Sequence, residues 1–166
     1  MFNETLQFSS RQIREVYVGE RLLAGYDFGV NSSGNRTDWL SDMNGSMRMD
    51  YPAGQSWGAV FITIGKSTNQ LRPWKDFSRF QTVAIELKAK QGGESIDIGI
   101  KDTNDADDGR EAKIKTPYLS TEWQTYNFTL SSFHTANLEE LYVVVEFVFE
   151  GPAEQTVFFR NIKYLP

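Results

Sequence analysis

Apolar and polar residues alternate along most of this chain with the two-residue period of half-buried β-strands. In the segment 80–90, Val83, Ile85 and Leu87 share one face, and the residues between them share the other. Clusters of Gly, Asn, Asp, Ser and Pro separate such segments and are typical of turns. About eight or nine short strands at regular spacing predict an all-β sandwich or barrel. The other predicted strands lie in the segments 45–51, 57–65, 95–102, 122–130, 140–151 and 155–165.

A helical period occurs only near the N-terminus. Within residues 9–18, Ile13, Val16 and Tyr17 fall at helical spacing, which allows one or two turns of helix. We therefore predict an N-terminal arm or linker remnant over residues 1–18, followed by a single sandwich domain over residues 19–166. A chain of 166 residues is long enough for one well-formed core.

Charge and cysteine content narrow the classes of partner. The formal net charge is −5, which argues against nucleic acid or an anionic membrane surface, because both favour a basic patch. No apolar run approaches the roughly 20 residues of a membrane-spanning helix, and no apolar signal region is visible at the start. The chain has no cysteine, so disulfide and thiol chemistry are excluded.

The residues that hydrolytic enzymes need are present without the expected arrangement. The only histidine, His134, follows a serine-containing turn with no Gly-x-Ser-x-Gly motif beside it, and we expect it to be solvated. Glycosidases use two facing carboxylates, and Glu86, Glu94, Asp97 and Glu146 could supply them. The spacing of Glu94 and Asp97 does not match the Glu-x-Asp-x-x-Glu strand of jelly-roll glucanases. We therefore predict no catalytic residues.

The acidic segment DTNDADDGRE, residues 102–111, has two interpretations. Its carboxylates and carbonyls are ligands that calcium prefers, although no register gives the ligand pattern of an EF-hand. The alternative is a solvated turn, which we favour.

Four phrases occur in the order found in one known group of domains. Around Trp123, the phrase TEWQTYNFTLSSF resembles a phrase of jelly-roll carbohydrate-binding modules of the galactose-binding-like superfamily. AGYDFG at residues 24–29 resembles the opening of family 11 and related modules. SIDIGIKDTND at 95–105 resembles their middle strand and loop, and VFFRNIKYL at 157–165 resembles their closing strand. The resemblance covers about residues 20–165.

This resemblance implies a fold and a setting. It implies a jelly-roll β-sandwich of two antiparallel sheets, with Trp123 packed in the core. The module would be secreted, extracellular or periplasmic, and attached to a catalytic domain in the same or an associated chain. Relatives also hold a structural calcium between the first and last strands, which carries over to Asp27 and Asn161. The chain departs from many relatives by having Arg160 and Asn161 where they carry an aspartate.

A sugar-binding face should combine flat aromatic rings, which stack on pyranose C–H groups, with charged or amide partners for the hydroxyls. In the relatives the concave sheet consists of the strands equivalent to 57–64, 96–101, 112–116 and 141–149. With the aliphatic residues of these strands turned inward, Tyr142, Val144, Glu146 and Val148 would face outward from the last strand, and Gly99 would leave room for a chain. The predicted carbohydrate-binding residues are Trp57, Phe61, Asp97, Lys101, Tyr142 and Glu146, with Trp74 and Tyr51 added by loops.

The sequence thus predicts a non-catalytic module that binds a soluble polysaccharide chain, such as a β-glucan, in a concave groove. One alternative stays open. The same sandwich serves protein–protein docking in complex I intermediate-associated proteins, where a partner would cover the concave face. Apolar residues such as Phe61 and Val148 on an outward face would then mark a protein interface.

Overall fold

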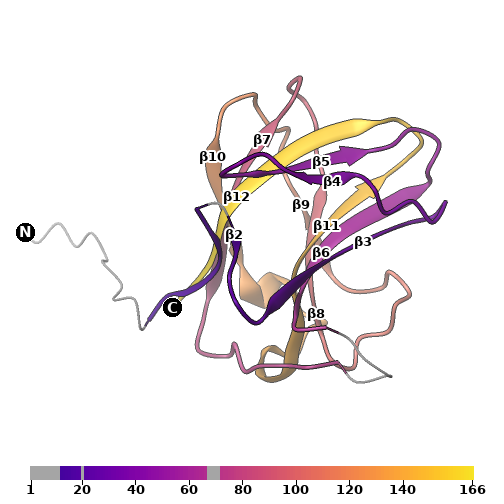
Figure 1. The fold of residues 1–166 in the computed structure, drawn as a ribbon. Helices are drawn as coiled ribbons and strands as arrows, with labels where there is room; N and C mark the ends of the chain where they lie inside the picture. Colours follow the sequence, from indigo (N-terminus) through magenta and orange to yellow (C-terminus); the bar gives the residue numbers. More distant parts are fainter. Residues whose placement is uncertain (1–11, 20, 67–71) are drawn as a thin grey trace, which may run out of the picture.

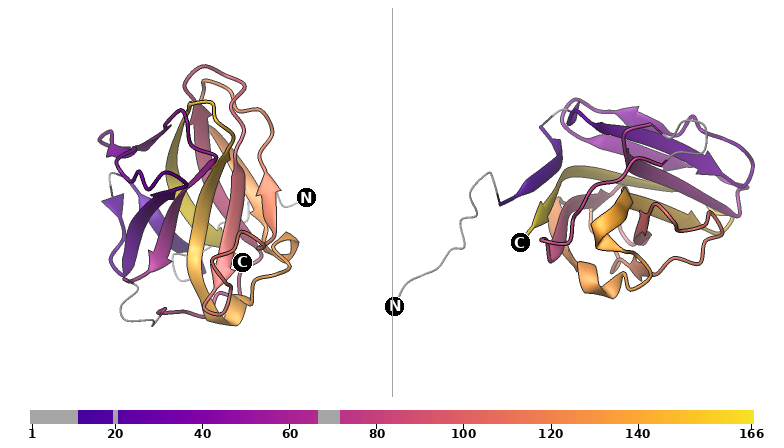
Figure 2. Two further views of the ribbon diagram at one scale, coloured as in Figure 1. Left: turned by 90° about the vertical axis from the view of Figure 1, so that its right-hand side faces the viewer. Right: turned by 90° about the horizontal axis from the view of Figure 1, so that it is seen from below.

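The computed structural model describes residues 12–19, 21–66 and 72–166. Its strands form two antiparallel sheets that pack face to face, as the side view and the view from below in Figure 2 show. The predicted β-sandwich is confirmed. Sheet A contains β1 (Arg14–Val18), β2 (Arg21–Leu22), β4 (Leu40–Asp42), β5 (Met47–Tyr51), β7 (Thr82–Ala89), β10 (Gln124–Thr129) and β12 (Gln155–Leu165). Sheet B contains β3 (Tyr26–Ser32), β6 (Trp57–Ile64), β8 (Asp97–Asp102), β9 (Lys113–Lys115) and β11 (Leu141–Glu150).

The chain passes repeatedly from one sheet to the other (Figure 1). Sheet A runs in the order β10-β7-β12-β1-β2, with β5 also paired to β12 and β4 paired to β5. Sheet B runs in the order β3-β6-β11-β8-β9. Two 3₁₀ turns, η1 (Leu130–Ser132) and η2 (Leu138–Glu140), lie between β10 and β11. Among the described residues, no helix has the length and apolar character of a membrane span.

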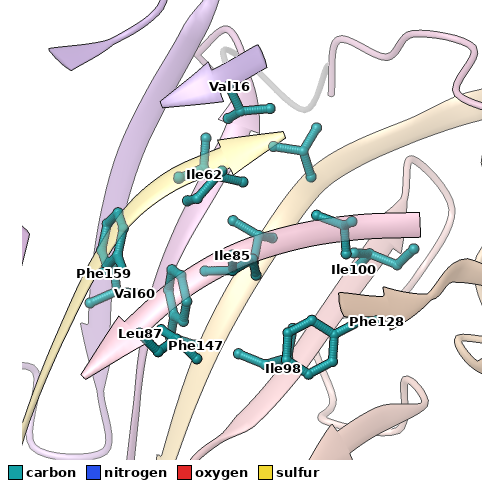
Figure 3. Close-up of a cluster of buried hydrophobic side chains, with 14 of the residues drawn as sticks. Val16, Val60, Ile62, Ile85, Leu87, Ile98, Ile100, Phe128, Phe147 and Phe159 are labelled. Atoms are coloured by element: carbon teal, nitrogen blue, oxygen red, sulfur yellow. The ribbon is translucent and has the colours of Figure 1, made fainter. Parts of the chain in front are cut away.

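The core lies between the sheets and uses the inward positions that the alternation predicts. Val60 and Ile62 of β6 and Ile85 and Leu87 of β7 are fully buried and lie in one cluster (Figure 3). Phe159 of β12 stacks on Phe147 of β11, with ring centres 4.6 Å apart. Burial of this apolar area is the main favourable term that holds the two sheets together.

The N-terminal prediction of a helical turn is wrong for residues 14–18, which form β1. Val16 and Tyr17 are consecutive residues and both are fully buried. Their burial is possible in a strand because the pairing of β1 with β12 shifts register between Glu15 and Tyr17, as at a β-bulge. The division of the chain after residue 18 stays a prediction, but β1 is paired into sheet A.

Trp123 is not in the core, which corrects the expectation drawn from the relatives. It is half-buried on the outer face of sheet A, where the Arg160 guanidinium lies 4.3 Å and the Lys88 ammonium 5.1 Å from the centre of its ring. The residues that β10 turns inward are at even positions, since Phe128 is buried. Trp123 therefore points outward with Thr125 and Asn127, and the same alternation in the sequence could have placed it there.

Candidate functional site

The four strands predicted to build the binding sheet are neighbours in sheet B. Their register sets one residue from each strand of the sheet in a single row, in the order Gly29, Phe61, Glu146, Gly99, Lys113. The row lies on the outer face, because the residues on either side of it along the strands, such as Val60 and Phe147, belong to the core. Two predicted site residues, Phe61 and Glu146, are thus cross-strand neighbours.

The two glycines of this row decide how their neighbours lie. A Cβ atom at Gly29 would come within 2.9 Å of Phe61 Cδ2 and closer still to the far end of the ring. A Cβ atom at Gly99 would come within 2.9 Å of Glu146 Cγ and closer still to Oε1. The Phe61 ring therefore covers Gly29, and the Glu146 carboxyl covers Gly99. Both side chains lie down on the sheet only because these positions lack a side chain.

Further aromatic residues continue from Phe61 along β6. Trp57 is 41 % exposed and lies on the same face, four residues before Phe61 and therefore about 13 Å away along the strand. Trp74, which is 52 % exposed, lies next to Lys75, whose backbone pairs with Leu141 at the start of β11. Its neighbour Pro73 lies beside Gly65, just after β6 ends. We call Trp57 and Phe61 the aromatic lane. Trp74 lies beyond the Phe61 end of this lane.

Charged residues occupy the other side of the face, on β8 and β9. Asp97 pairs with Val148 on one side and with Lys115 on the other, one row from Glu146. The Lys115 ammonium lies 3.4 Å from Asp97 Oδ1, and its side chain is 68 % exposed. The Asp97 side chain is only 13 % exposed, so Lys115 is the partner that is open to solvent and can exchange this contact for a hydroxyl group of a ligand.

Lys101 and Tyr142 are also near this face, but a loop covers them. The β8–β9 loop, residues 103–112, bonds to Lys101 through the carboxylate of Asp107 at 2.8 Å and the carbonyl of Ala106 at 3.0 Å. Arg72 lies over the Tyr142 ring at 5.4 Å and pairs with Asp107 at 2.7 Å. Lys101 is 6 % and Tyr142 8 % exposed. Both residues support the loop rather than standing open to a ligand.

Carboxylates of the acidic segment accept hydrogen bonds from backbone amides around them. Asp102 accepts hydrogen bonds from the amides of Asn104 and Asn137, at 2.7 and 2.8 Å. The side chain of Asp105 accepts one from the Asp102 amide at 2.8 Å. These contacts support the interpretation as a turn. In the part of the chain that the structure describes, no group of three or more Asp, Glu, His or Cys residues could hold a metal ion.

The two residues predicted to hold calcium are not brought together. Asp27 is in β3 of sheet B, and Asn161 is in β12 of sheet A. The Asn161 amide bonds to Glu86 on the outer face of sheet A, whereas Asp27 pairs in register with Thr63 on the outer face of sheet B. The sandwich lies between them. A calcium ion elsewhere stays a prediction, but this pair does not fit it.

Two other expectations about this site are wrong. Tyr51 is 1 % exposed and stacked on Phe149 in the core, and its hydroxyl donates to the Gly151 carbonyl at 2.7 Å. Val144 points into the core beside Val145, because the register of β11 against β6 shifts at this point. The regular alternation of β5 could have placed Tyr51, whereas the unbroken apolar run of β11 conceals the shift.

Glu146 and Glu111 are two strongly interacting ionisable groups on this face. Glu111 was not among the site residues predicted from the sequence. Burial, followed by the contact with Glu111, raises the pKa of Glu146 to about 9. Burial acts to raise the pKa of Glu111 as well, but hydrogen bonds from Glu146 and the backbone, with Lys113 and Lys101 nearby, lower it overall. Both shifts favour a proton on Glu146 and a negative charge on Glu111.

Two small hollows lie elsewhere. One of about 220 Å³ is lined by Asp50, Lys90 and Glu94 beside sheet A. The other, of about 190 Å³, is lined by residues that include Glu86 and Asn161. Neither is lined by Trp57, Phe61 or Glu146. His134 is exposed, as expected.

Comparison with known proteins identifies the family. Residues 8–165 match the family model described as carbohydrate binding domain 30. The chain belongs to this family. Its members are non-catalytic carbohydrate-binding modules, and the predicted resemblance to such modules is confirmed. None of the curated proteins compared with the chain matches it.

Solved structures of related modules share the fold of this family 30 member. The family 30 module of the cellulosomal cellulase Cel9D-Cel44B of Clostridium thermocellum is 15 % identical, with a TM-score of 0.64 over 92 % of this chain and 96 % of that one. A family 11 module of Clostridium thermocellum, in complex with a β-1,3-1,4-mixed-linked tetrasaccharide, is also 15 % identical, with a TM-score of 0.61 over 92 % and 95 %. A family 29 module variant complexed with cellulohexaose is 15 % identical, with a TM-score of 0.58 over 92 % and 89 %. At this identity the likeness establishes the fold alone.

Proposed function

We propose that the outer face of sheet B binds an internal stretch of a soluble, neutral polysaccharide of the β-glucan type. The observation that carries this proposal is the Phe61 ring lying over Gly29, in line with the exposed Trp57 on the same strand. A ring that lies along the sheet can stack on the C–H face of a pyranose and exclude water from it. Two such rings on one strand suit an extended chain rather than a single sugar.

The polar side of the face supplies partners for the sugar hydroxyls. Phe61 leans from β6 toward β3, and Glu146 leans from β11 toward β8, so the two side chains leave a strip open between them. The next row along this strip is floored by Ala59 and Val148. Asp97 and Lys115 continue that row on β8 and β9, and they can bond hydroxyl groups through a charged acceptor or donor.

The kind of polymer follows from the shape of the face and from the relatives. The β8–β9 loop covers part of the face at Lys101 and Tyr142, so the surface is not flat and suits a single chain better than a crystal surface. Related modules were solved with a mixed-linked β-glucan tetrasaccharide and with cellulohexaose. We expect dissociation constants on the order of 10–100 µM, because an open face buries little area and must order the sugar chain.

A binding module of this kind would hold a catalytic domain close to its polymeric substrate. We place that domain in the same chain or in an associated one, and the module in the extracellular or periplasmic space, where polysaccharides too large to cross a membrane occur. The aromatic lane, with Trp57 exposed and Phe61 half-buried on one strand, suits this supporting role.

Affinity electrophoresis of the folded chain tests the proposal. The gels would contain mixed-linkage β-glucan, hydroxyethylcellulose, glucomannan or no polymer. Trp57→Ala removes one ring of the aromatic lane, and Trp123→Ala is the matched control, since it removes a half-buried tryptophan from the outer face of sheet A. We expect at least one polymer to retard the wild type and Trp123→Ala but not Trp57→Ala.

Two outcomes would contradict this reading. Equal retardation of both variants would place the binding site away from the aromatic lane. Absence of retardation by every polymer, together with self-association of the folded chain in sedimentation, would favour the docking alternative and make the outer face of sheet B a protein interface.

A further inference from the structure

Two carboxyl groups meet in the middle of the outer face of sheet B. Glu146 comes from β11, and Glu111 comes from the β8–β9 loop. Glu146 is 6 % exposed, and the side chain of Glu111 is also 6 % exposed. Glu146 Oε1 and Glu111 Oε2 are both buried, and neither accepts a hydrogen bond from any other group in the described residues. Oxygen atoms buried in this way are costly unless a donor reaches them.

A single proton, shared between the two carboxyl groups, would supply the hydrogen bond that both buried oxygen atoms lack. Each carboxyl group is close enough to shift the pKa of the other, and a hydrogen bond between them would give both buried oxygen atoms a partner. Two carboxylate ions have no hydrogen to donate, so this bond requires one of the two groups to be protonated. Glu146 is the more deeply buried of the two groups. Burial disfavours the charged form of a carboxyl group, so the proton belongs on Glu146.

The neighbouring lysines do not donate hydrogen bonds to these two buried oxygen atoms. The Lys113 ammonium lies 3.6 Å from Glu111 Oε1, the oxygen on the other side of that carboxylate, and also donates to the Gly109 carbonyl. The Lys101 ammonium donates to Asp107 and to the Ala106 carbonyl. From β6, the residue opposite Glu146 is the uncharged Phe61. The remaining charged pair on β8 and β9, Asp97 with Lys115, stands one row away.

We propose that Glu111 and Glu146 share one proton as a pH-sensitive clasp, which fastens the β8–β9 loop to the sugar-binding face and positions the polar side of that face for its ligand. The part of this inference that concerns the ligand rests on the proposed function. Loss of the proton would leave two buried anions in contact, and the loop carrying Glu111 would leave the face. Lys101 and Tyr142, which the loop covers, would then be exposed to solvent.

The direction of the pH effect follows from the raised pKa of Glu146. Its folded-state pKa of about 9 lies above the ordinary value of 4.5. The stability that the protonated pair contributes is therefore complete below pH 4.5 and is lost as the pH rises through 9. If the ligand binds only the clasped form, its affinity is about tenfold lower at pH 10 than at pH 8.

The experiment follows carboxyl protonation, thermal stability and polysaccharide affinity from pH 6 to pH 10.5. Side-chain carboxyl ¹³C NMR of the wild type should show one glutamate that titrates near pH 9, and this signal should be absent in Glu146→Gln. The amide of Glu146→Gln can donate to Glu111 at every pH, so its Tm should lack the alkaline step of the wild type. Glu150→Gln is the matched control, since Glu150 is exposed on the same strand, and it should keep the step. Calorimetric titration with mixed-linkage β-glucan should show the tenfold loss only in the wild type and in Glu150→Gln.

The outcomes separate the clasp from the sugar site. A carboxyl titration complete below pH 6 in the wild type, or an alkaline Tm step retained in Glu146→Gln, would overturn the clasp whether or not a polymer binds. An alkaline step without polysaccharide binding at any pH would overturn the proposed function and its link to the clasp, and would leave the shared proton standing. Affinity that is unchanged through pH 10 while the step occurs would overturn the positioning role. The NMR titration of the wild type decides the matter even if a variant does not fold.

Discussion

Gly29→Ala should disturb the aromatic lane without unfolding the protein. The added Cβ atom would lie within 2.9 Å of Phe61 Cδ2 and nearer to the tip of the ring, so the ring must leave the sheet surface. Gly29 is not among the residues with a left-handed backbone, so alanine fits its backbone. Alanine is favoured over glycine in a strand by about 0.5–1 kcal/mol, which offsets part of the packing that the displaced ring loses. We expect the free energy of unfolding to change by less than about 1 kcal/mol.

The loss should appear in affinity instead. If stacking on Phe61 contributes as much as an aromatic pair, about 0.5–1.5 kcal/mol, its removal weakens binding roughly 2- to 13-fold. Isothermal titration with a soluble β-glucan would measure this for the wild type, Gly29→Ala, Phe61→Ala and the double variant. Because Gly29 acts only through Phe61, Gly29→Ala should have no further effect in the Phe61→Ala background. Unchanged affinity in Gly29→Ala, or an equal loss in both backgrounds, would refute this account.

Two further substitutions test the surroundings of the site. Arg72→Ala removes one of the two cations that bond to Asp107, the other being Lys101, so we expect faster amide hydrogen exchange in the β8–β9 loop with a decrease in Tm of only a few degrees. Arg110→Ala, whose side chain is 88 % exposed, should leave exchange unchanged. Tyr51→Phe deletes the hydrogen bond to the Gly151 carbonyl, and we expect a loss of about 1 kcal/mol in a denaturant titration with no change in polysaccharide affinity. A loss of affinity in Tyr51→Phe would return Tyr51 to the binding site.

Strands with one polar face could be predicted from the sequence, and strands with irregular pairing could not. The alternation in β7 and β8 gave the correct buried faces, for example Val83, Ile85 and Leu87. In β1, two adjacent buried residues result from a register shift against β12, and their spacing imitates a helix. In β11 nearly every residue is apolar, so nothing in the sequence shows where the shift near Val144 occurs. Register shifts depend on the partner strand, which lies far away along the chain.

The same limit explains which parts of the candidate site could be predicted. Strand alternation placed Trp57, Phe61 and Glu146 on the outward faces of their strands, and the resemblance to known modules placed those strands in one sheet, as the structure shows. The flat position of Phe61 depends on Gly29, which belongs to a strand that pairs with β6 from more than 30 residues away. Glu111 reaches Glu146 only through the path of a loop, and the sequence around it shows only another acid in an acidic segment. Cross-strand neighbours can therefore be predicted only when the pairing order of the strands in the sheet is known.

Gly99 connects the two proposed features of this face. A Cβ atom there would come closest to Glu146 Oε1, the buried oxygen atom for which we propose the shared proton. Gly99→Ala should therefore push the Glu146 carboxyl off the sheet, into the strip beside Phe61, and break the clasp at the same time. Gly29→Ala displaces a ring on the opposite side of the strip and leaves the carboxyl pair untouched. We expect Gly99→Ala to lose both polysaccharide affinity and the alkaline step in Tm, whereas Gly29→Ala should lose affinity alone. If both variants kept the step, the carboxyl contact over Gly99 would not be what fastens the loop.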